Sequence, residues 1–453
     1  MKTILVLIFT FMLVFLACQS ERKQKKANDE TSVKKRISTG CVNTVTSGKD
    51  PSCRFALYLP ADSTEPLPLF IFFDPHGKAR DVAEKYKGLA DKYSCAIAVS
   101  VNIRNGMKPD ECEHYFYSMY NEICGIINED TSHIYLSGLS GGARVAAYLT
   151  LKSGIPAGLI TCGAGVPEIA GINNNKFYYA GIAGLGDFAF SELYNSANEI
   201  KNNAMHSCFI YFEGKHEWPS DSIMEYAFMT MLSEKNKDFS EKISKLIKSH
   251  EGRQWKKYLT YNTIIDLLKI LPGYEKEKQE INTYLNSKES SGARRDIENI
   301  LKSENAEISK MKNAAMNFES AWWKKHIGSL QVTDGKPAYS LTDYKNIRML
   351  GYIGIMEYML VSSALNNNDL KSAYFFLQIY SLAEPQNADV SYYYGVYLTK
   401  TGNFKDAIDS LENAVNKGFD DYSRWMSQSD FSRLRDSLRF NELEAKLSTG
   451  DQN

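Results

Sequence analysis

The chain has 453 residues, with 53 basic and 54 acidic side chains and a formal net charge of −1 at pH 7. This balance leaves no strong positive field to gather a phosphate backbone, so the composition disfavours nucleic-acid binding. With 43% hydrophobic and 24% charged residues, it also excludes a fibrous or wholly disordered chain. The length predicts two or more folded units.

An apolar run from Thr3 to Ala17 opens the chain after one positive residue. It is short for a bilayer span, and its position is typical of a cleaved export signal at 1–18. Its end, Leu16-Ala17-Cys18, resembles the lipobox of bacterial lipoproteins, whose cysteine is acylated. Phe15 stands where that motif usually has leucine, so simple secretion without lipidation is the alternative. We expect an exported lipoprotein, anchored to a membrane through Cys18 at the periplasmic face or the cell surface.

The remaining cysteines are odd in number, so at least one is expected to stay free or to pair between chains. Cys41 and Cys53 are close enough in sequence to form a disulfide. Cys95, Cys162 and Cys208 lie in apolar runs and are expected to be small buried hydrophobic residues. The sequence has no CxxC and no HExxH, so it predicts neither a metal site nor a cofactor.

From residue 55 to residue 235, short apolar runs alternate with longer amphipathic stretches, which is typical of an α/β fold with a mostly parallel, doubly wound sheet. The expected strands are 55–60, 68–73, 95–101, 133–138, 157–163, 178–185 and 208–214. The expected helices are 79–93, 111–129, 141–153, 189–205 and 221–235. Several strands are apolar almost throughout, as burial on both faces requires. The pattern predicts one α/β domain at 40–235, after a flexible tether at 19–39.

A G-x-S-x-G pattern, Gly138 to Gly142, follows an expected strand and precedes an expected helix. Alone the pattern is common by chance, and its place between strand and helix gives it weight. A turn tight enough to expose the Ser140 hydroxyl brings the flanking backbone into near contact, which favours glycine on both sides. The next helix then directs backbone N–H groups at developing negative charge. Ser140 is therefore a candidate nucleophile, with a plain glycine-rich turn as the alternative.

A serine nucleophile needs a histidine base that is oriented by a carboxylate. Asp187 follows the expected strand 178–185, and His216 follows the next one. Both positions are carboxyl ends of strands, at the same sheet edge as Ser140. The alternative carboxylates are Glu213, Glu217 and Asp221. The other histidines after the serine are expected on the surface, and they are His206, His250 and His326.

The domain resembles the serine esterases of the α/β-hydrolase fold, close to feruloyl-esterase and polyhydroxybutyrate-depolymerase-like enzymes. The resemblance rests on the GLSGG turn, on the loop Asp74-Pro75-His76-Gly77 after a strand, and on the segment GKHEWP at 214–219. That segment is similar to the G-x-H-x-W-P around the catalytic histidine of these enzymes. The resemblance covers 40–235, which is less than half of the chain.

The resemblance implies an acyl-enzyme reaction that needs no cofactor. In it Ser140 attacks the acyl carbonyl, His216 accepts and returns the proton, and Asp187 orients the imidazole. The implied substrates are carboxylic esters, including esters carried on carbohydrate.

The resemblance also implies an oxyanion hole. In these families the His-Gly loop donates one backbone N–H, which carries over to Gly77 or Lys78, and Gly141 supplies the second donor. Lys78 stands where a second glycine is common. His76 and Trp218 are expected beside the substrate, although Trp218 is equally well interpreted as a packed loop residue.

After residue 235 the strand signals stop and helical periodicity begins, without a clear repeat over 236–340. The part at 341–450 resembles tetratricopeptide (TPR) helix pairs, which have a 34-residue period. Pairs of apolar residues with this spacing are Leu370 with Phe404, Ala373 with Ala407, and Leu377 with Leu411. Small residues at such positions let paired helices approach closely. These TPR-like helices imply either a protein partner or a role in shaping the hydrolase entrance.

The favoured hypothesis is an exported serine hydrolase of ester bonds with a helical appendage. One alternative is a non-catalytic binding or scaffolding lipoprotein that acts through its TPR-like helices. A hydrolase fold that had lost its activity would be expected to lack at least one of the three catalytic residues. The presence of Ser140, Asp187 and His216 argues against this alternative. A serine peptidase is the second alternative, ranked lower because no propeller or extended substrate domain is added to the fold. The expected partners are an ester substrate, a membrane and a protein on the helices, with no nucleic acid.

Overall fold

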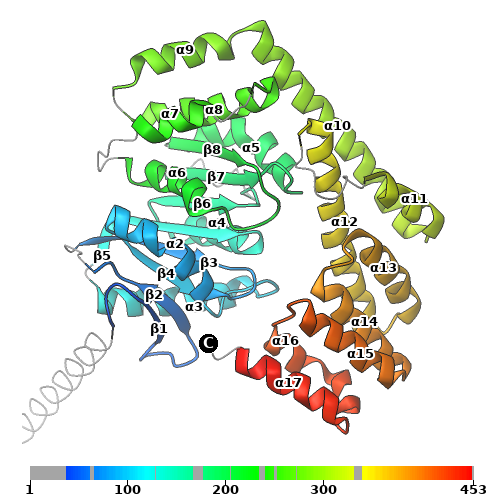
Figure 1. Ribbon diagram of the computed structural model, residues 1–453. Coiled ribbons are helices and arrows are strands. Elements are labelled where there is room, and N and C mark those ends of the chain that lie inside the picture. Colours follow the sequence, from blue (N-terminus) through cyan, green and yellow to red (C-terminus); the bar gives the residue numbers. More distant parts are fainter. Residues whose placement is uncertain are drawn as a thin grey trace, which may run out of the picture.

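An eight-stranded sheet with helices on both faces is followed by a long helical region (Figure 1). This computed structural model describes residues 37–61, 66–127, 129–166, 177–204, 206–233, 240–248, 252–271, 273–330 and 339–450. The expected export signal with Cys18, and also His250, lie outside the described residues. Within these ranges, none of the helices has the length and hydropathy needed to cross a bilayer.

The sheet has the strand order β1-β2-β4-β3-β5-β6-β7-β8. The first three strands in this order pair antiparallel, and all later neighbours pair parallel. The strands are β1 (Val42–Thr46), β2 (Arg54–Tyr58), β3 (Leu67–Phe73), β4 (Ala96–Ser100), β5 (Glu129–Leu139), β6 (Gly158–Cys162), β7 (Tyr178–Gly184) and β8 (His206–Phe212). The seven predicted strands are all present. The sequence analysis missed β1, because this edge strand is half polar and only partly buried.

Helices cover both faces of the sheet, as the alternating pattern predicts. They are α2 (Ala79–Tyr93), α3 (Pro109–Ile126), α4 (Gly141–Ser153), α5 (Phe190–Asn203) and α6 (Asp221–Met231). Within β3, which is buried along its whole length, Phe70 and Phe72 pack into one core with α2 and α6. Leu69, Ile71 and Phe73 pack into the other core with α3 and α4. This confirms the prediction of a mostly parallel, doubly wound sheet.

The cysteines of the sheet domain follow the predicted pattern only in part. Cys95, Cys162 and Cys208 are buried, as predicted for small hydrophobic residues. The disulfide considered between Cys41 and Cys53 is not formed, because Cys41 is an exposed thiol and Cys53 a buried one.

The helical region begins as an extension of the sheet domain. Its helices are α7 (Ser240–Lys248), α8 (Gln254–Ile270), α9 (Glu275–Leu285), α10 (Lys288–Met316), α11 (Ser320–Leu330), α12 (Leu341–Asn366), α13 (Leu370–Ala383), α14 (Ala388–Thr401), α15 (Phe404–Asn416), α16 (Tyr422–Ser427) and α17 (Leu438–Gly450), with a 3-10 helix, η3, at Ser429–Leu434. Ile264 and Leu267 of α8 and Ile281 of α9 belong to the same core as the sheet. The hydrophobic core of the sheet therefore continues past residue 235.

The C-terminal helices α12 to α17 lie beside the sheet domain and are connected to it through the long α10 (Figure 1). Helix α12 packs along α13, and α14 packs along α15. Of the three pairs with the 34-residue spacing, two are fully buried, namely Ala373 with Ala407 and Leu377 with Leu411. In the third pair, Leu370 is half-buried and Phe404 is exposed. A Cβ atom on Gly395 would lie 2.5 Å from a methyl group of Leu411, so α14 and α15 approach closely there. The assignment of this region to the TPR family stays a prediction.

Glu357 of α12 is fully buried, and neither carboxylate oxygen has a hydrogen-bond partner in the described part of the chain. Burial raises the pKa of this carboxyl from 4.5 to about 8. Because the pKa is higher in the folded state, the unfolded chain loses this proton first. The unfolding free energy therefore falls as the pH rises from about 4.5 to about 8. The loss is on the order of 4 to 5 kcal/mol. Above pH 8 we therefore expect Glu357→Gln to be more stable than the wild type.

Urea unfolding of both proteins at pH 5 and pH 9 measures this effect. The glutamine variant is expected to have nearly the same unfolding free energy at the two pH values, apart from changes shared with the wild type. An identical decline in both proteins would show that Glu357 is not the group responsible.

Candidate active site

Ser140 lies at the turn between β5 and α4, with backbone angles φ 53° and ψ −118°. A positive φ is unusual for a residue with a side chain, and such strained positions occur at functional sites. The glycines on either side are required by packing. A Cβ atom would lie 2.2 Å from the Gly142 backbone at Gly138, and 2.0 Å from the Phe73 carbonyl oxygen at Gly142. The turn is therefore as tight as the G-x-S-x-G pattern predicts.

Asp187 and His216 form a pair at the neighbouring strand ends. His216 Nδ1 lies 2.9 Å from Asp187 Oδ1, and the aspartate is only 1% exposed. The same oxygen accepts a hydrogen bond from the Ala189 N–H at 2.8 Å, which fixes the carboxylate at the start of α5. Because a carboxylate only accepts, Nδ1 carries the proton and Nε2 is left as the basic nitrogen.

The alternative carboxylates have other partners. Glu213 forms ion pairs with Arg253 and Lys256 at the start of α8. Glu217 accepts a hydrogen bond from the backbone N–H of Lys215. Asp221 accepts a hydrogen bond from the Ser222 N–H at 2.7 Å. The carboxylate hydrogen-bonded to His216 is that of Asp187.

The end of β6 lies between the serine turn, which follows β5, and the His–Asp pair, which follows β7 and β8. The Ser140 N–H donates to the Cys162 carbonyl oxygen at 2.8 Å, where β6 ends. The next residue, Gly163, lies against the pair. A Cβ atom there would lie 2.9 Å from both Asp187 Oδ2 and the His216 ring. The structure therefore brings the three predicted residues to one edge of the sheet.

The loop after β3 is organised by Asp74, whose side chain is buried. Its Oδ1 atom accepts the backbone N–H groups of His76 at 2.9 Å and Lys78 at 3.1 Å. Its Oδ2 atom accepts the indole N–H of Trp218 at 2.7 Å. The Gly77 N–H donates to the Asp74 carbonyl oxygen at 3.1 Å. Both predicted donors of this loop, Gly77 and Lys78, thus already have acceptors within the turn.

Trp218 joins this loop to the segment that carries His216. Its ring packs against Phe72 and Tyr86, each with a centroid separation of 5.9 Å. These contacts favour the packed-residue interpretation of Trp218 over a pocket wall. His76 is exposed beside it.

Asn105, in the loop after β4, is a site residue that the sequence analysis missed. Its N–H donates to the Pro75 carbonyl oxygen at 2.9 Å, which ties it to the loop after β3. Its side-chain amide lies against Gly141, where a Cβ atom would lie only 1.8 Å from Asn105 Oδ1. An amide group donates as well as accepts. A lone asparagine in a loop carries no sequence pattern that reveals this position.

The C-terminal helices contact the site on the side of the Asp74 loop. Lys78 Nζ forms an ion pair with Asp420 at 2.7 Å, and Arg104 donates to the Ser423 hydroxyl at 3.3 Å. The two charges of the ion pair are exposed, so this contact is expected to add little to stability.

On the opposite side, α12 supports the loop that carries Asp187. Arg348 is 2% exposed and donates to the Leu185 carbonyl oxygen at 2.5 Å. It also forms a buried ion pair with Glu304 of α10, and its guanidinium lies over the Phe190 ring at 4.9 Å. Removing one partner of such a buried pair leaves an uncompensated charge and is strongly destabilising.

A second line of contacts from α12 reaches His216. Gly351 packs against Phe188, and the Phe188 ring lies 4.1 Å from the His216 ring. Ile347 fills the space beside Gly186. The position of His216 therefore depends on α12 as well as on its own strand.

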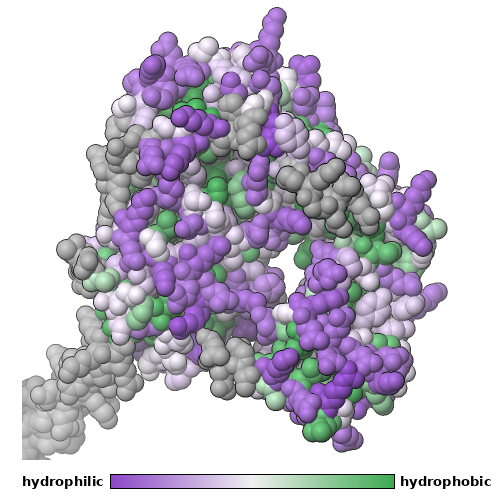
Figure 2. Space-filling model, viewed as in Figure 1, coloured by the Kyte–Doolittle hydropathy of each residue, from purple (hydrophilic) through white to green (hydrophobic). Residues whose placement is uncertain are grey.

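The C-terminal helices thus contact two sets of loops at the sheet edge that carries Ser140. One set contains Lys78 and Arg104, and the other contains Leu185 and Phe188. Figure 2 shows an opening between the sheet domain and the C-terminal helices. The two roles that the sequence leaves open for these helices, contact with a protein partner and shaping of an entrance, stay predictions.

The remaining histidines show one error in the sequence analysis. His326 was expected on the surface, but its side chain is 14% exposed, lies 3.3 Å from Glu307 and stacks on Trp322. Burial lowers its pKa. His206 is partly exposed and stacks on Tyr178. Across the described ranges, no group of three or more His, Cys, Asp or Glu side chains is arranged to hold a metal ion.

Comparison with known proteins gives a likeness in fold only. No family model matches the chain, and no curated protein matches it. Among solved structures, it is similar to S-formylglutathione hydrolase from Staphylococcus aureus, with 14% identity over 42% of this chain and 94% of the other, and a TM-score of 0.35. A fluorophosphonate-binding serine hydrolase from the same organism shows 12% identity, 42% and 99% coverage, and a TM-score of 0.35. A ferulic acid esterase shows 15% identity, 39% and 90% coverage, and a TM-score of 0.31. None of these values assigns a substrate to this chain.

Proposed function

We propose that this protein is a serine hydrolase that cleaves carboxylic esters through an acyl-enzyme. The observation that carries the proposal is the Asp187–His216 hydrogen bond, held against the turn that presents Ser140 at positive φ. A strained serine, an oriented imidazole and a buried carboxylate at one sheet edge form the arrangement that this chemistry requires.

In the proposed reaction, His216 Nε2 removes the Ser140 hydroxyl proton as the serine oxygen attacks the acyl carbonyl. The ring becomes an imidazolium, which Asp187 stabilises through Nδ1–H. His216 then returns the proton to the leaving alcohol. A water molecule, activated by the same imidazole, releases the acid and restores the serine.

The oxyanion formed on attack needs donors beside Ser140. The Gly141 N–H lies at the start of α4, where backbone N–H groups point out of the helix. We assign the second donor to the Asn105 Nδ2 group, which lies 3.6 Å from the position of a Cβ atom on Gly141, because the Gly77 and Lys78 N–H groups bond within their own turn. Use of the Gly77 or Lys78 N–H would require breaking one of those hydrogen bonds.

Asn105→Ala is therefore expected to lower kcat by about 10²- to 10³-fold with little change in KM, as for loss of one oxyanion donor. Asn105→Asp is the matched variant, because it keeps the shape and loses the donor, and it should be at least as slow. Steady-state hydrolysis of p-nitrophenyl acetate measures both. Full activity in both variants would contradict the assignment of Asn105 and would favour the Gly77 or Lys78 backbone N–H as the second donor.

The sequence supports three further parts of the proposal. They are export with lipidation at Cys18, substrates that carry the ester on carbohydrate, and TPR-like helices that contact a partner. Radiolabelled palmitate incorporation, compared between the full chain and Cys18→Ala, tests the lipid anchor.

Ester and peptide cleavage are separated by matched leaving groups. The purified protein is expected to hydrolyse p-nitrophenyl acetate and butyrate, and to leave the corresponding p-nitroanilides intact. Cleavage of the anilides at a comparable rate would favour the peptidase alternative. Hydrolysis of neither would favour a binding protein.

A further inference from the structure

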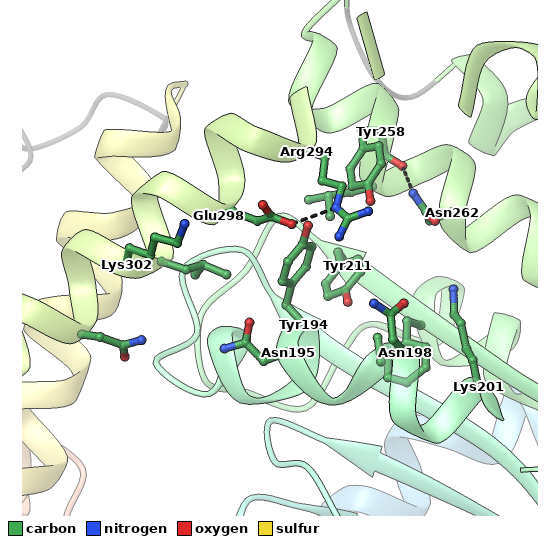
Figure 3. Close-up of a pocket in the computed structure, with 15 residues that line it drawn as sticks. Tyr194, Asn195, Asn198, Lys201, Tyr211, Tyr258, Asn262, Arg294, Glu298 and Lys302 are labelled. Carbon is green, nitrogen blue, oxygen red and sulfur yellow. Dashed lines mark hydrogen bonds and ion pairs between the residues drawn. The ribbon is translucent and has the colours of Figure 1, made fainter. Parts of the chain in front are cut away.

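A cavity of about 280 Å³ lies apart from the catalytic residues, between α5, α8 and α10 and against β8 (Figure 3). None of Ser140, Asp187 and His216 lines it. Its lining combines aromatic rings with side-chain amides, namely Tyr194, Tyr211, Tyr258, Asn195, Asn198, Asn262 and Asn305. Its volume is close to the lower end of the range for small-molecule sites, so it fits a short ligand.

Three tyrosines from three different elements form the wall of this cavity (Figure 3). Tyr194 comes from α5, Tyr211 is next to the last residue of β8, and Tyr258 comes from α8. Burial raises the pKa of Tyr194 and of Tyr211, so both remain neutral phenols. Tyrosine rings offer an apolar face together with a hydroxyl that donates and accepts.

Asparagine amides form the rim. Asn195 and Asn198 are exposed on α5, and Asn305 is exposed on α10. Asn262 donates to the Tyr258 carbonyl oxygen at 2.8 Å, which directs its amide. Each amide offers two donors and an acceptor oxygen, which matches a ligand whose own groups both donate and accept.

The charged groups of the cavity are largely neutralised within the protein. Arg294 forms an ion pair with Glu298 at 2.8 Å, and Lys201 forms one with Asp266 at 2.6 Å. Lys302, exposed at the edge, is the remaining cation of the lining. An anionic ligand would have to compete with these internal carboxylates, whereas an uncharged ligand meets no unpaired charge in the interior.

We propose that this cavity binds a short neutral saccharide, independently of the ester hydrolysis proposed above. The apolar face of a sugar ring packs on the tyrosine wall, and its hydroxyls exchange hydrogen bonds with the asparagine amides and the phenols. Among small ligands, sugars combine an apolar ring face with many uncharged groups that both donate and accept, which is the combination this lining offers. The cavity is lined by α5, the helix that begins just after Asp187, so a bound glycan would lie on the flank of the catalytic domain.

Isothermal titration calorimetry on the Ser140→Ala protein tests the proposal without turnover. The probes are xylobiose, cellobiose, N,N′-diacetylchitobiose and inorganic phosphate. At least one disaccharide is expected to bind, and phosphate is expected not to compete with it. Saturable binding of phosphate alone, or binding of none of the four, would overturn the proposal.

Two single substitutions locate the binding. Asn198→Ala and Tyr258→Phe each remove groups of the cavity, and each is expected to weaken disaccharide binding by about tenfold, or 1.4 kcal/mol. Asn299→Ala, an exposed asparagine of α10 outside the lining, is the matched control and should bind like the parent. Unchanged affinity in both cavity variants would show that the sugar binds elsewhere, which would also overturn the proposal. Circular dichroism confirms that each variant is folded.

Discussion

Ser140→Ala is expected to hydrolyse p-nitrophenyl acetate about 10⁴- to 10⁶-fold more slowly than the wild type in kcat, as for loss of a nucleophile in a catalytic triad. The stability of the protein should change little, because alanine keeps the same strained backbone at φ 53°. Ser140→Gly is expected to be as inactive and about 1 kcal/mol more stable, since glycine adopts this conformation without strain.

Ser153, the last residue of α4, supplies the matched control, because its hydroxyl contacts nearby backbone: it donates to the Leu149 carbonyl oxygen and accepts from the Ile155 N–H. Ser153→Ala should keep wild-type activity. Comparable rates of ester hydrolysis by Ser140→Ala and the wild type would contradict the triad assignment, even if both proteins have the same fold.

Arg348→Met is expected to lower both stability and activity. The variant leaves the buried Glu304 without its partner, which typically costs about 3 to 5 kcal/mol. It also removes the hydrogen bond to the Leu185 carbonyl oxygen, which holds the loop that carries Asp187. Because a small misplacement of a catalytic group has a large effect on rate, we expect kcat to fall by about 10- to 100-fold. Urea unfolding and ester hydrolysis measure the two effects.

The double variant Arg348→Met/Glu304→Met separates the two roles of Arg348. Replacement of both charges is expected to recover most of the lost stability, because no unpaired charge remains. The activity should stay low, because the Leu185 carbonyl still lacks its donor. Recovery of full activity together with stability would show that α12 does not position the acid loop.

Local patterns were sufficient to predict seven of the eight strands of the sheet. Its buried strands are apolar along their whole length, and a tight strand-to-helix turn with a serine at its centre needs glycines at 138 and 142. The positions of Asp187 and His216 followed from strand ends alone. The predicted hydrogen bond between them is present at 2.9 Å.

The features that escaped prediction depend on contacts between distant segments. Asn105 is close to Gly141 only because two loops meet at the sheet edge, and Phe188 reaches His216 through a loop that α12 holds in place. Arg348 appears in the sequence as one more charged residue of a long helix, yet it is buried and donates to the Leu185 carbonyl oxygen of the sheet domain. The same holds for His326, whose burial depends on α10 and α11 packing together.

The relation between the two parts of the molecule was the largest open question in the sequence. Contacts at Lys78 and Arg104 on one side, and at Leu185 and Phe188 on the other, connect the C-terminal helices to loops around Ser140. No periodicity within the helices predicts such contacts, because they depend on where the C-terminal helices pack against the sheet domain.

The most direct test of the proposed triad is covalent labelling with a fluorophosphonate probe, followed by mass spectrometry of the labelled peptide. The probe reacts with an activated serine without any knowledge of the substrate. The wild type is expected to carry the label on Ser140 alone, and the labelling rate should fall sharply in His216→Ala. A protein that stays unlabelled, or a label on another serine that persists in Ser140→Ala, would contradict the account.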